Sequence, residues 1–200
     1  MRTLTLLPCL LATATVALSQ EPPKAEPSKA DVTTQQRNPF SARNRQLYQG
    51  EKKILLGAAE KMPEQNYTFK PTEAVRSFGQ IVGHIAESQY FFCSSVLGEK
   101  SPAPKIEQTK TSKADLIAAL KDAFAYCDKA YDGMTDASGA QMVKLFGNDT
   151  PKLDVLTINN MHNMEHYGNM VTYMRIKGIV PPTSEQPPQA QTKPQDQPKK

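Results

Sequence analysis

The clearest helix in this 200-residue chain reads SKADLIAALKDAFAYCDKAYDGM, residues 112–134. Its apolar residues recur three or four positions apart, which places them on one side of an α-helix. They are Leu116, Leu120, Phe124, Cys127, Tyr131 and Met134. Ser112 and Asp115 add the Ser-x-x-Asp pattern that is typical of a helix start. The stretch therefore predicts an amphipathic helix that buries one face against other helices.

Apolar residues have the same helical spacing in three other blocks, at about residues 42–61, 78–97 and 153–177. Ser77 and Gln80 form a capping box before the second of these blocks, which stops at Gly98. Four amphipathic helices of this length form a bundle. The sequence therefore predicts an all-α fold, a four-helix bundle over residues 41–182.

The two ends of the chain differ from the middle, because they hold most of its 16 prolines. Residues 1–19 have a basic start, an apolar run and a small-x-small cleavage site, the pattern of a secretory signal peptide. The apolar run is too short to cross a bilayer, so we expect export to the periplasm or the medium, without stable membrane insertion after cleavage. Residues 20–40 and 183–200 have little to bury, which predicts a disordered linker and a disordered Pro/Gln/Lys tail.

Charge and cysteine content narrow the possible partners and chemistry. The formal net charge of +4, from mixed acidic and basic residues, does not favour a nucleic-acid partner. Removal of the signal peptide leaves Cys93 and Cys127, in a compartment where disulfides form. Neither has a second cysteine or a histidine at zinc-finger spacing. We predict two small buried side chains, with a disulfide or a nucleophile as the alternatives.

The chain has three histidines, and His162 and His166 are one helical turn apart in the fourth block. This spacing points both rings to the same side, where they interrupt an apolar stripe. His84 lies in the second block between Ile81 and Ile85, where it can face the pair across the bundle. Three imidazoles would bind one divalent metal ion and leave a coordination position open for a small-molecule substrate. The alternative is a set of hydrogen-bonded core histidines without metal.

Two glutamates next to these histidines are the candidates for a catalytic residue. Glu165 lies between His162 and His166, and Glu87 follows His84 by about one turn. Each could orient a ring, act as a base or be a solvated surface acid. The letters His-x-x-Glu-His also occur in one class of zinc peptidase. That class needs another carboxylate ligand downstream, where the chain offers only one glutamate, in the predicted tail, so we do not favour it.

Several motifs taken together resemble the DinB/YfiT-like superfamily. They are Ser77-Phe78-Gly79-Gln80, Val82-Gly83-His84-Ile85-Ala86, His162-x-x-x-His166-x-Gly168-Asn169 and Arg175-x-x-Gly178-Ile179-Val180-Pro181-Pro182. The resemblance spans nearly all of residues 41–182. It implies an up-up-down-down four-helix bundle, often dimeric, with a long connection between helices two and three. It also implies that zinc, nickel or iron binds to His84, His162 and His166.

The resemblance also implies a range of activities, since members include thiol transferases, a thiol-dependent isomerase and hydrolase-like enzymes. We therefore expect a metal-dependent enzyme, hydrolase-like or transferase, of unknown substrate. Two features depart from the family, namely Gly168-Asn169 where Gly-Gln is usual and the predicted export, which removes the chain from the cytosolic thiol pool. The alternatives are a non-catalytic metal-binding or stress-related bundle and a metal-free bundle. A fourth protein ligand such as Glu165 or Glu87 would indicate a structural ion.

The fourth block is apolar on two sides, because Met164 and Val171 lie opposite the histidines. A helix of this kind needs a second packing partner. Helix one of the same chain or the matching helix of a second subunit would serve. We expect a homodimer.

Overall fold

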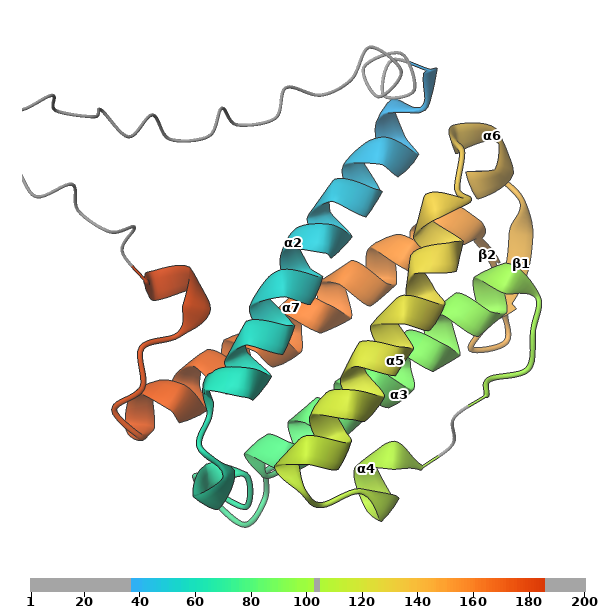
Figure 1. Cartoon of the computed structure of the whole chain (residues 1–200). Coiled ribbons are helices and arrows are strands. Elements are labelled where there is room, and N and C mark those ends of the chain that lie inside the picture. Colours follow the sequence, from blue (N-terminus) through green and yellow to red (C-terminus); the bar gives the residue numbers. More distant parts are fainter. Residues whose placement is uncertain (1–36, 103–104, 186–200) are drawn as a thin grey trace, which may run out of the picture.

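The computed structural model describes residues 37–102 and 105–185 (Figure 1). The signal peptide predicted for residues 1–19 lies outside the described residues, as do most of the predicted linker and tail. The elements in chain order are α2 (Pro39–Lys61), η1 (Glu64–Asn66), α3 (Phe78–Leu97), α4 (Ile106–Thr109), α5 (Lys113–Asp132), α6 (Asp136–Gly139), β1 (Met142–Leu145), β2 (Asn148–Pro151), α7 (Lys152–Ile176) and η2 (Pro182–Ser184). The long helices α2, α3, α5 and α7 coincide with the four predicted blocks, which confirms the helical bundle.

In the bundle, α2 and α3 each pack against both α5 and α7 (Figure 1). Hydrogen bonds show that α2 and α7 run in the same direction. Asn44 donates to Thr157, and Glu51, two turns further along α2, accepts from Asn163 on α7. Polar contacts between these helices therefore fix their register as well as their direction.

Helix α3 runs parallel to α5 and antiparallel to α7. Gly83 approaches Leu116 near the starts of α3 and α5, and Gln89 of α3 is hydrogen-bonded to Asn163 of α7. Tyr173, near the end of α7, donates to the carbonyl of Arg76, just before α3 begins. The four long helices are thus ordered up, down, down, up. This corrects the up-up-down-down order implied by the resemblance.

The long connection between helices two and three, residues 98–112, follows from this order. Because α3 and α5 are parallel, the chain must return along a helix of 20 residues, or about 30 Å, before α5 can begin. A tight turn cannot join parallel helices. The predicted long connection is therefore confirmed, and it carries the short helix α4, which packs on α3.

The core fills the space between the four helices. Of the apolar residues that define the predicted α5, Leu116, Leu120, Phe124 and Tyr131 are buried. The ring of Tyr131 stacks on that of Tyr48 from α2, with 3.8 Å between the ring centroids. The apolar spacing along α5 therefore identified its buried face correctly.

Cys93 and Cys127 form a disulfide that joins α3 to α5, with 5.3 Å between their Cα atoms. This corrects the prediction of two separate buried side chains. The two sulfur atoms meet because the helices are parallel and adjacent, an arrangement that a separation of 34 residues does not reveal.

A chain of polar side chains crosses the core beside the disulfide. Asn159 Nδ2 donates to Gln89 Oε1 over 2.9 Å, and Gln89 Nε2 donates to Asn163 Oδ1 over 2.6 Å. Asn163 Nδ2 in turn donates to Glu51 Oε2 over 3.2 Å. The side chain of Glu51 is only 7% exposed, and burial raises its pKa to about 7, although the hydrogen bond from Asn163 lowers it.

The raised pKa of Glu51 predicts a specific dependence of stability on pH. Between pH 4.5 and 7 the unfolded carboxyl loses its proton and the folded one keeps it, so this residue makes the free energy of unfolding fall as pH rises. We expect Glu51→Gln to lack this contribution. The difference in the free energy of unfolding between the variant and wild type should therefore shift in favour of the variant by about 2–3 kcal/mol from pH 4.5 to pH 8. Urea unfolding in the presence of a chelator measures it, with the exposed Glu64→Gln as the control. An equal pH dependence in Glu51→Gln and wild type would contradict the assignment.

Residues 183–185, at the start of the predicted tail, are exposed but make polar contacts with the bundle. The Tyr167 hydroxyl contacts the Thr183 hydroxyl at 3.0 Å and accepts from the Thr183 backbone N–H at 3.1 Å. Glu185 forms an ion pair with Lys61 at the end of α2. The polar contacts of the bundle therefore reach as far as residue 185.

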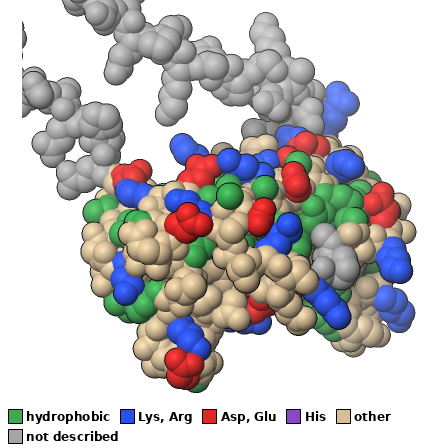
Figure 2. Space-filling view, turned by 60° about the horizontal axis from the view of Figure 1, so that its bottom comes forward, with side chains coloured by type: hydrophobic (Ala, Val, Ile, Leu, Met, Phe, Trp, Pro, Cys, Tyr) green, Lys and Arg blue, Asp and Glu red, His purple; other side chains and the backbone are tan. Residues whose placement is uncertain are grey.

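The surface mixes both signs of charge. Acidic and basic side chains are interspersed over the face seen in Figure 2. Within residues 37–102 and 105–185, no helix is both long and apolar enough to span a membrane.

Candidate metal centre

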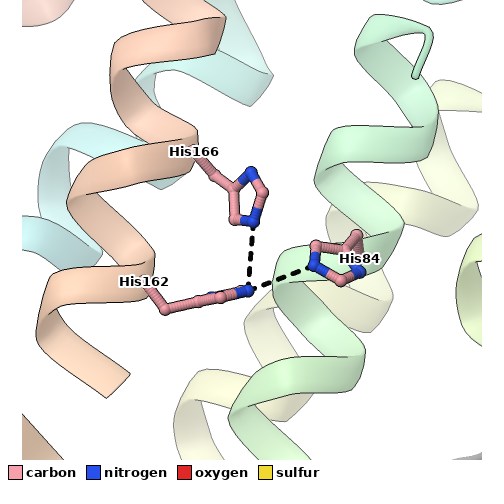
Figure 3. A group of neighbouring side chains, drawn as sticks. All are labelled: His84, His162 and His166. Atoms are coloured by element: carbon pink, nitrogen blue, oxygen red, sulfur yellow. Dashed lines mark hydrogen bonds between the residues drawn. The ribbon is translucent and has the colours of Figure 1, made fainter. Parts of the chain in front are cut away.

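The three histidines meet between α3 and α7 (Figure 3). Because the two helices are antiparallel, His84 from the first half of α3 lies opposite the pair on α7. The Nε2 atom of His162 lies 3.1 Å from Nε2 of His84 and 3.0 Å from Nε2 of His166. One nitrogen from each ring lies within 4.8 Å of the other two. The structure therefore brings together all three residues that the sequence proposed as ligands.

These separations fit nitrogen atoms that share one metal ion. Zinc binds imidazole nitrogen at about 2.0–2.1 Å. Two such nitrogens are about 3.0 Å apart when the angle at the ion is a right angle, and about 3.4 Å apart at the tetrahedral angle. The Nε2–H of a neutral His162 can donate to one of the other two rings, but the Nδ1 atoms of His162 and His166 are then buried without a hydrogen-bond partner among the described residues. The donor set therefore fits a divalent cation.

Burial keeps the three rings neutral. It lowers the pKa of His162 to about 3, with further lowering by His166 and His84, and it lowers the pKa of His166 to about 4. The pKa of His84 is lowered as well, chiefly by burial and next by Arg76, while Glu107 opposes the shift. At neutral pH each ring therefore has a free lone pair, the form that a metal ion requires.

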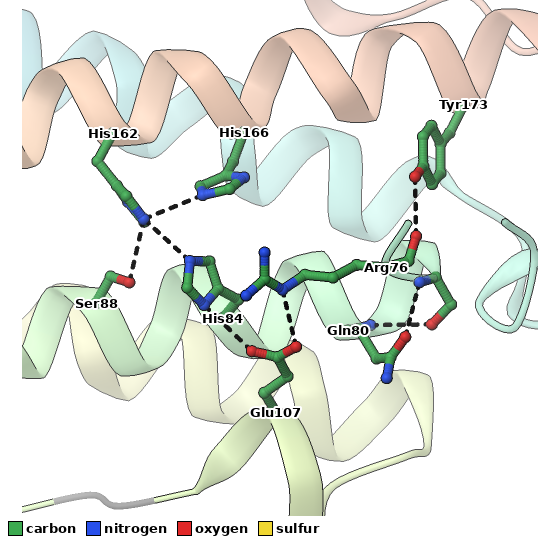
Figure 4. A network of polar contacts seen from close by, with 9 residues as sticks. Arg76, Gln80, His84, Ser88, Glu107, His162, His166 and Tyr173 are labelled. Atoms are coloured by element: carbon green, nitrogen blue, oxygen red, sulfur yellow. Dashed lines mark hydrogen bonds and ion pairs between the residues drawn. The ribbon is translucent and has the colours of Figure 1, made fainter. Parts of the chain in front are cut away.

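Glu107 of α4 orients His84 (Figure 4). One carboxylate oxygen lies 3.2 Å from His84 Nδ1, and the other accepts from Arg76 Nε over 2.8 Å. A carboxylate on Nδ1 favours the tautomer whose Nε2 lone pair points to the other histidines. Glu107 was not predicted from the sequence, because it lies in the connection and comes next to His84 only through packing of α4 on α3. The one feature of the sequence that could have indicated Glu107 is Gly83, because the missing side chain leaves room for α4 to approach α3.

Gly83 is the residue that allows α4 to approach α3. A Cβ atom at this position would lie 2.8 Å from the Cα of Glu107, too close for either backbone to stay in place. We expect Gly83→Ala to destabilise the protein by about 1–3 kcal/mol. We also expect metal binding to weaken by about tenfold or more, because Glu107 moves from His84. Gly50→Ala in α2 is the matched control, since nothing lies within 4 Å of the added Cβ, and it should stabilise the helix by about 0.5–1 kcal/mol.

Thermal unfolding and metal titration of the two glycine variants measure these effects. Equal metal affinity in Gly83→Ala and Gly50→Ala would show that the position of Glu107 does not matter to the site.

The two catalytic candidates lie beside the histidines but do not join the ligand group. Among the described residues, no carboxylate belongs to the cluster that His84, His162 and His166 form. Glu165 is exposed, and Glu87 is half-buried. Within residues 37–102 and 105–185, the candidate centre therefore offers three histidine nitrogens and no carboxylate ligand.

Two cavities open at the histidines. The larger has a volume of about 590 Å³ and is lined by His166 together with Arg76, Gln80, Glu107, Glu165 and Tyr173, among others. The smaller, about 320 Å³, is lined by His84, Glu87, Ser88, Phe91, Phe92, Phe146 and His162. The histidine cluster thus has a polar approach on one side and an apolar approach on the other.

Comparison with known proteins identifies the superfamily of the chain. The DinB superfamily model matches residues 46–170, more than half of the chain, and the chain belongs to this superfamily. The uncharacterized protein YjoA of Bacillus subtilis (strain 168) is 25% identical over 126 residues, which cover 60% of this chain and 79% of YjoA.

Solved structures show the same fold. A DinB-like protein from Bacillus cereus ATCC 10987 superposes with a TM-score of 0.60 at 17% identity, covering 66% of this chain and 89% of its own. The structure of YjoA from Bacillus subtilis gives a TM-score of 0.58 at 23% identity, covering 69% of this chain and 93% of its own.

Proposed function

We propose that this protein is an exported metal-dependent enzyme, hydrolase-like or transferase, that acts on a small molecule at one divalent ion held by His84, His162 and His166. The convergence of the three Nε2 atoms beside two cavities, with no carboxylate from the described part of the chain in the cluster, supports the proposal most directly. A structural ion is normally closed off by four protein ligands, whereas a catalytic ion keeps a position open. Membership of the DinB superfamily agrees with a metal site on these residues.

The residues around the centre have separable roles in this proposal. A divalent ion bound here would act as a Lewis acid on an oxygen or sulfur atom of the substrate. Glu107 accepts a hydrogen bond from His84 Nδ1 and so directs the Nε2 lone pair inward. Arg76 holds Glu107 in place through its ion pair. Imidazole nitrogen suits several first-row metals, so zinc, nickel and iron are all compatible with the ligand set.

Glu165 and Glu87 have different places in the proposal. Glu165 lines the larger cavity next to His166, where a carboxylate could take a proton from a substrate in that cavity. Glu87 lines the smaller cavity, which is otherwise mainly aromatic. We therefore propose Glu165 as the general base and assign no proton transfer to Glu87.

An open coordination position is the property that separates an enzyme from a structural metal bundle. The mature protein loaded with Co²⁺ should have a visible spectrum that reports the coordination of the ion. We expect added azide to change this spectrum, because it can enter the open position. An unchanged spectrum at saturating azide would favour the non-catalytic alternative.

Export is proposed from the signal pattern and supported by the disulfide between Cys93 and Cys127. Disulfides persist in oxidising compartments and are rare in the cytosol. Mass spectrometry of the protein recovered from the periplasm or the medium would test this, with a mature chain that begins at Gln20 as the expected result.

A homodimer is proposed from apolar side chains that remain on the surface. Met161 and Met164 of α7 are 67% and 45% exposed, and Leu47 of the adjacent α2 is 44% exposed. Apolar residues at such positions are typical of helices that pair with a second subunit. Light scattering should give twice the mass of one chain, and a charge introduced by Met164→Glu should reduce that mass by half.

A further inference from the structure

The smaller cavity beside the histidines has three aromatic walls. Phe91 and Phe92 come from α3, and Phe146 comes from the turn of the β1–β2 hairpin. The Phe146 ring stacks on Phe91 with 5.3 Å between the centroids, and the Phe92 ring meets His162 edge to face at 5.7 Å. The hairpin therefore brings a third aromatic ring to a space that already reaches two of the proposed metal ligands.

The position of Phe146 is unfavourable for the protein alone. The side chain is 72% exposed, and its backbone has a φ of 49°, in the left-handed region that a bulky residue rarely adopts. Gly147 follows with a φ of 83°, which completes a two-residue turn whose first position usually holds asparagine, aspartate or glycine. Strained backbone positions of this kind cluster at binding and active sites. The exposed ring of Phe146 beside the cavity therefore indicates a role in binding.

The charges at this cavity limit what it can receive. Glu87 is the one charged side chain among its lining residues, so the cavity has no basic side chain to pair with an anionic group on the ring. A metal ion on His84 and His162 would disfavour a cationic group. The volume of about 320 Å³ is at the lower end for small-molecule sites and suits one ring rather than a long chain. Together these features favour an uncharged aromatic group.

We propose that this cavity binds an uncharged aromatic group of the substrate, while a neighbouring atom of the same molecule takes the open position on the metal. This inference rests on the proposed function and names the class of substrate for that site. The ring lies against Phe91, Phe92 and Phe146, and the polar remainder of the molecule extends toward the larger cavity at His166.

Hydroxamates test the proposal, because both acetohydroxamate and benzohydroxamate chelate divalent metals and only the second has an aromatic ring. The Co²⁺-loaded mature protein is titrated with each hydroxamate, and the change in its visible spectrum gives both dissociation constants. We expect benzohydroxamate to bind at least about tenfold more tightly than acetohydroxamate. In Phe146→Ala this preference should fall to about threefold or less, while the affinity for acetohydroxamate stays the same.

Met142→Ala is the matched control, since Met142 is an exposed apolar residue of the same hairpin, 61% exposed, and does not line the cavity. It should keep the wild-type preference. Phe91→Ala, on α3, should repeat the effect of Phe146→Ala without altering the hairpin. Equal affinity of wild type for the two hydroxamates, or an unchanged preference in both phenylalanine variants, would overturn this inference alone. If neither hydroxamate changes the spectrum, the proposed open metal site is overturned instead.

Discussion

Replacement of His162 and His166 together by alanine is expected to reduce bound metal from about one ion per chain to less than about 0.1. The two residues supply two of the three ligand nitrogens, and His84 alone cannot hold a divalent ion against a competing chelator. Because all three rings are held neutral by burial, little proton competition hides this loss at neutral pH. Elemental analysis of the purified wild type and the variant, each loaded with Zn²⁺ and then desalted, measures it.

The fold should survive this double replacement. The core, the disulfide and the Gln89–Asn163–Glu51 hydrogen bonds do not depend on an ion. Far-ultraviolet circular dichroism should therefore match wild type. Thr172→Ala, also on α7 but exposed and outside the cluster, serves as the control and should keep its metal. Equal metal content in the double variant and wild type would rule out the proposed centre.

Loss of the disulfide is expected to lower the free energy of unfolding by about 3–4 kcal/mol. The bond closes a loop of 34 residues, and a loop of that size restricts the unfolded chain by about this amount. Both sulfur atoms are buried between α3 and α5, so the Cys93→Ala/Cys127→Ala variant also loses packing. Guanidinium unfolding of wild type and of the variant, both without metal, gives the difference.

Reduction of the wild-type protein separates the two contributions to this loss. Treatment with dithiothreitol opens the loop and keeps the sulfur atoms in place, so reduced wild type should lie between the oxidised protein and the double variant. If oxidised wild type and the double variant unfold at the same guanidinium concentration, the bond does not stabilise the fold.

The sequence predicted the parts of this protein that depend on local spacing. The four long helices, the capping box at Ser77 and the shared direction of His162 and His166 all follow from residues within a few turns of one another. His84 was placed opposite the pair from its position between Ile81 and Ile85 in the second block, and the resemblance to the family implied the same residue. Local spacing and family motifs together were therefore sufficient to identify the three histidines that the structure brings together.

What the sequence could not supply depends on contacts between distant segments. The order of helix directions, the disulfide and the role of Glu107 each require knowledge of which helices are neighbours. Gly83 is an example. A glycine inside a helix can be explained in several ways, and only the packing of α4 on α3 shows that this one makes room for Glu107. The aromatic wall was also missed, since Phe146 lies in a hairpin that the apolar spacing did not predict.

The covalent ring closed by Cys93 and Cys127 has Glu107 among its members. The carboxylate that orients His84 is therefore tethered at both ends to helices that are themselves locked together. Reduction would leave the length of this connection unchanged, but it would remove the cross-link that keeps α3 and α5 together beside it. The disulfide therefore limits how far the two helices that flank Glu107 can separate.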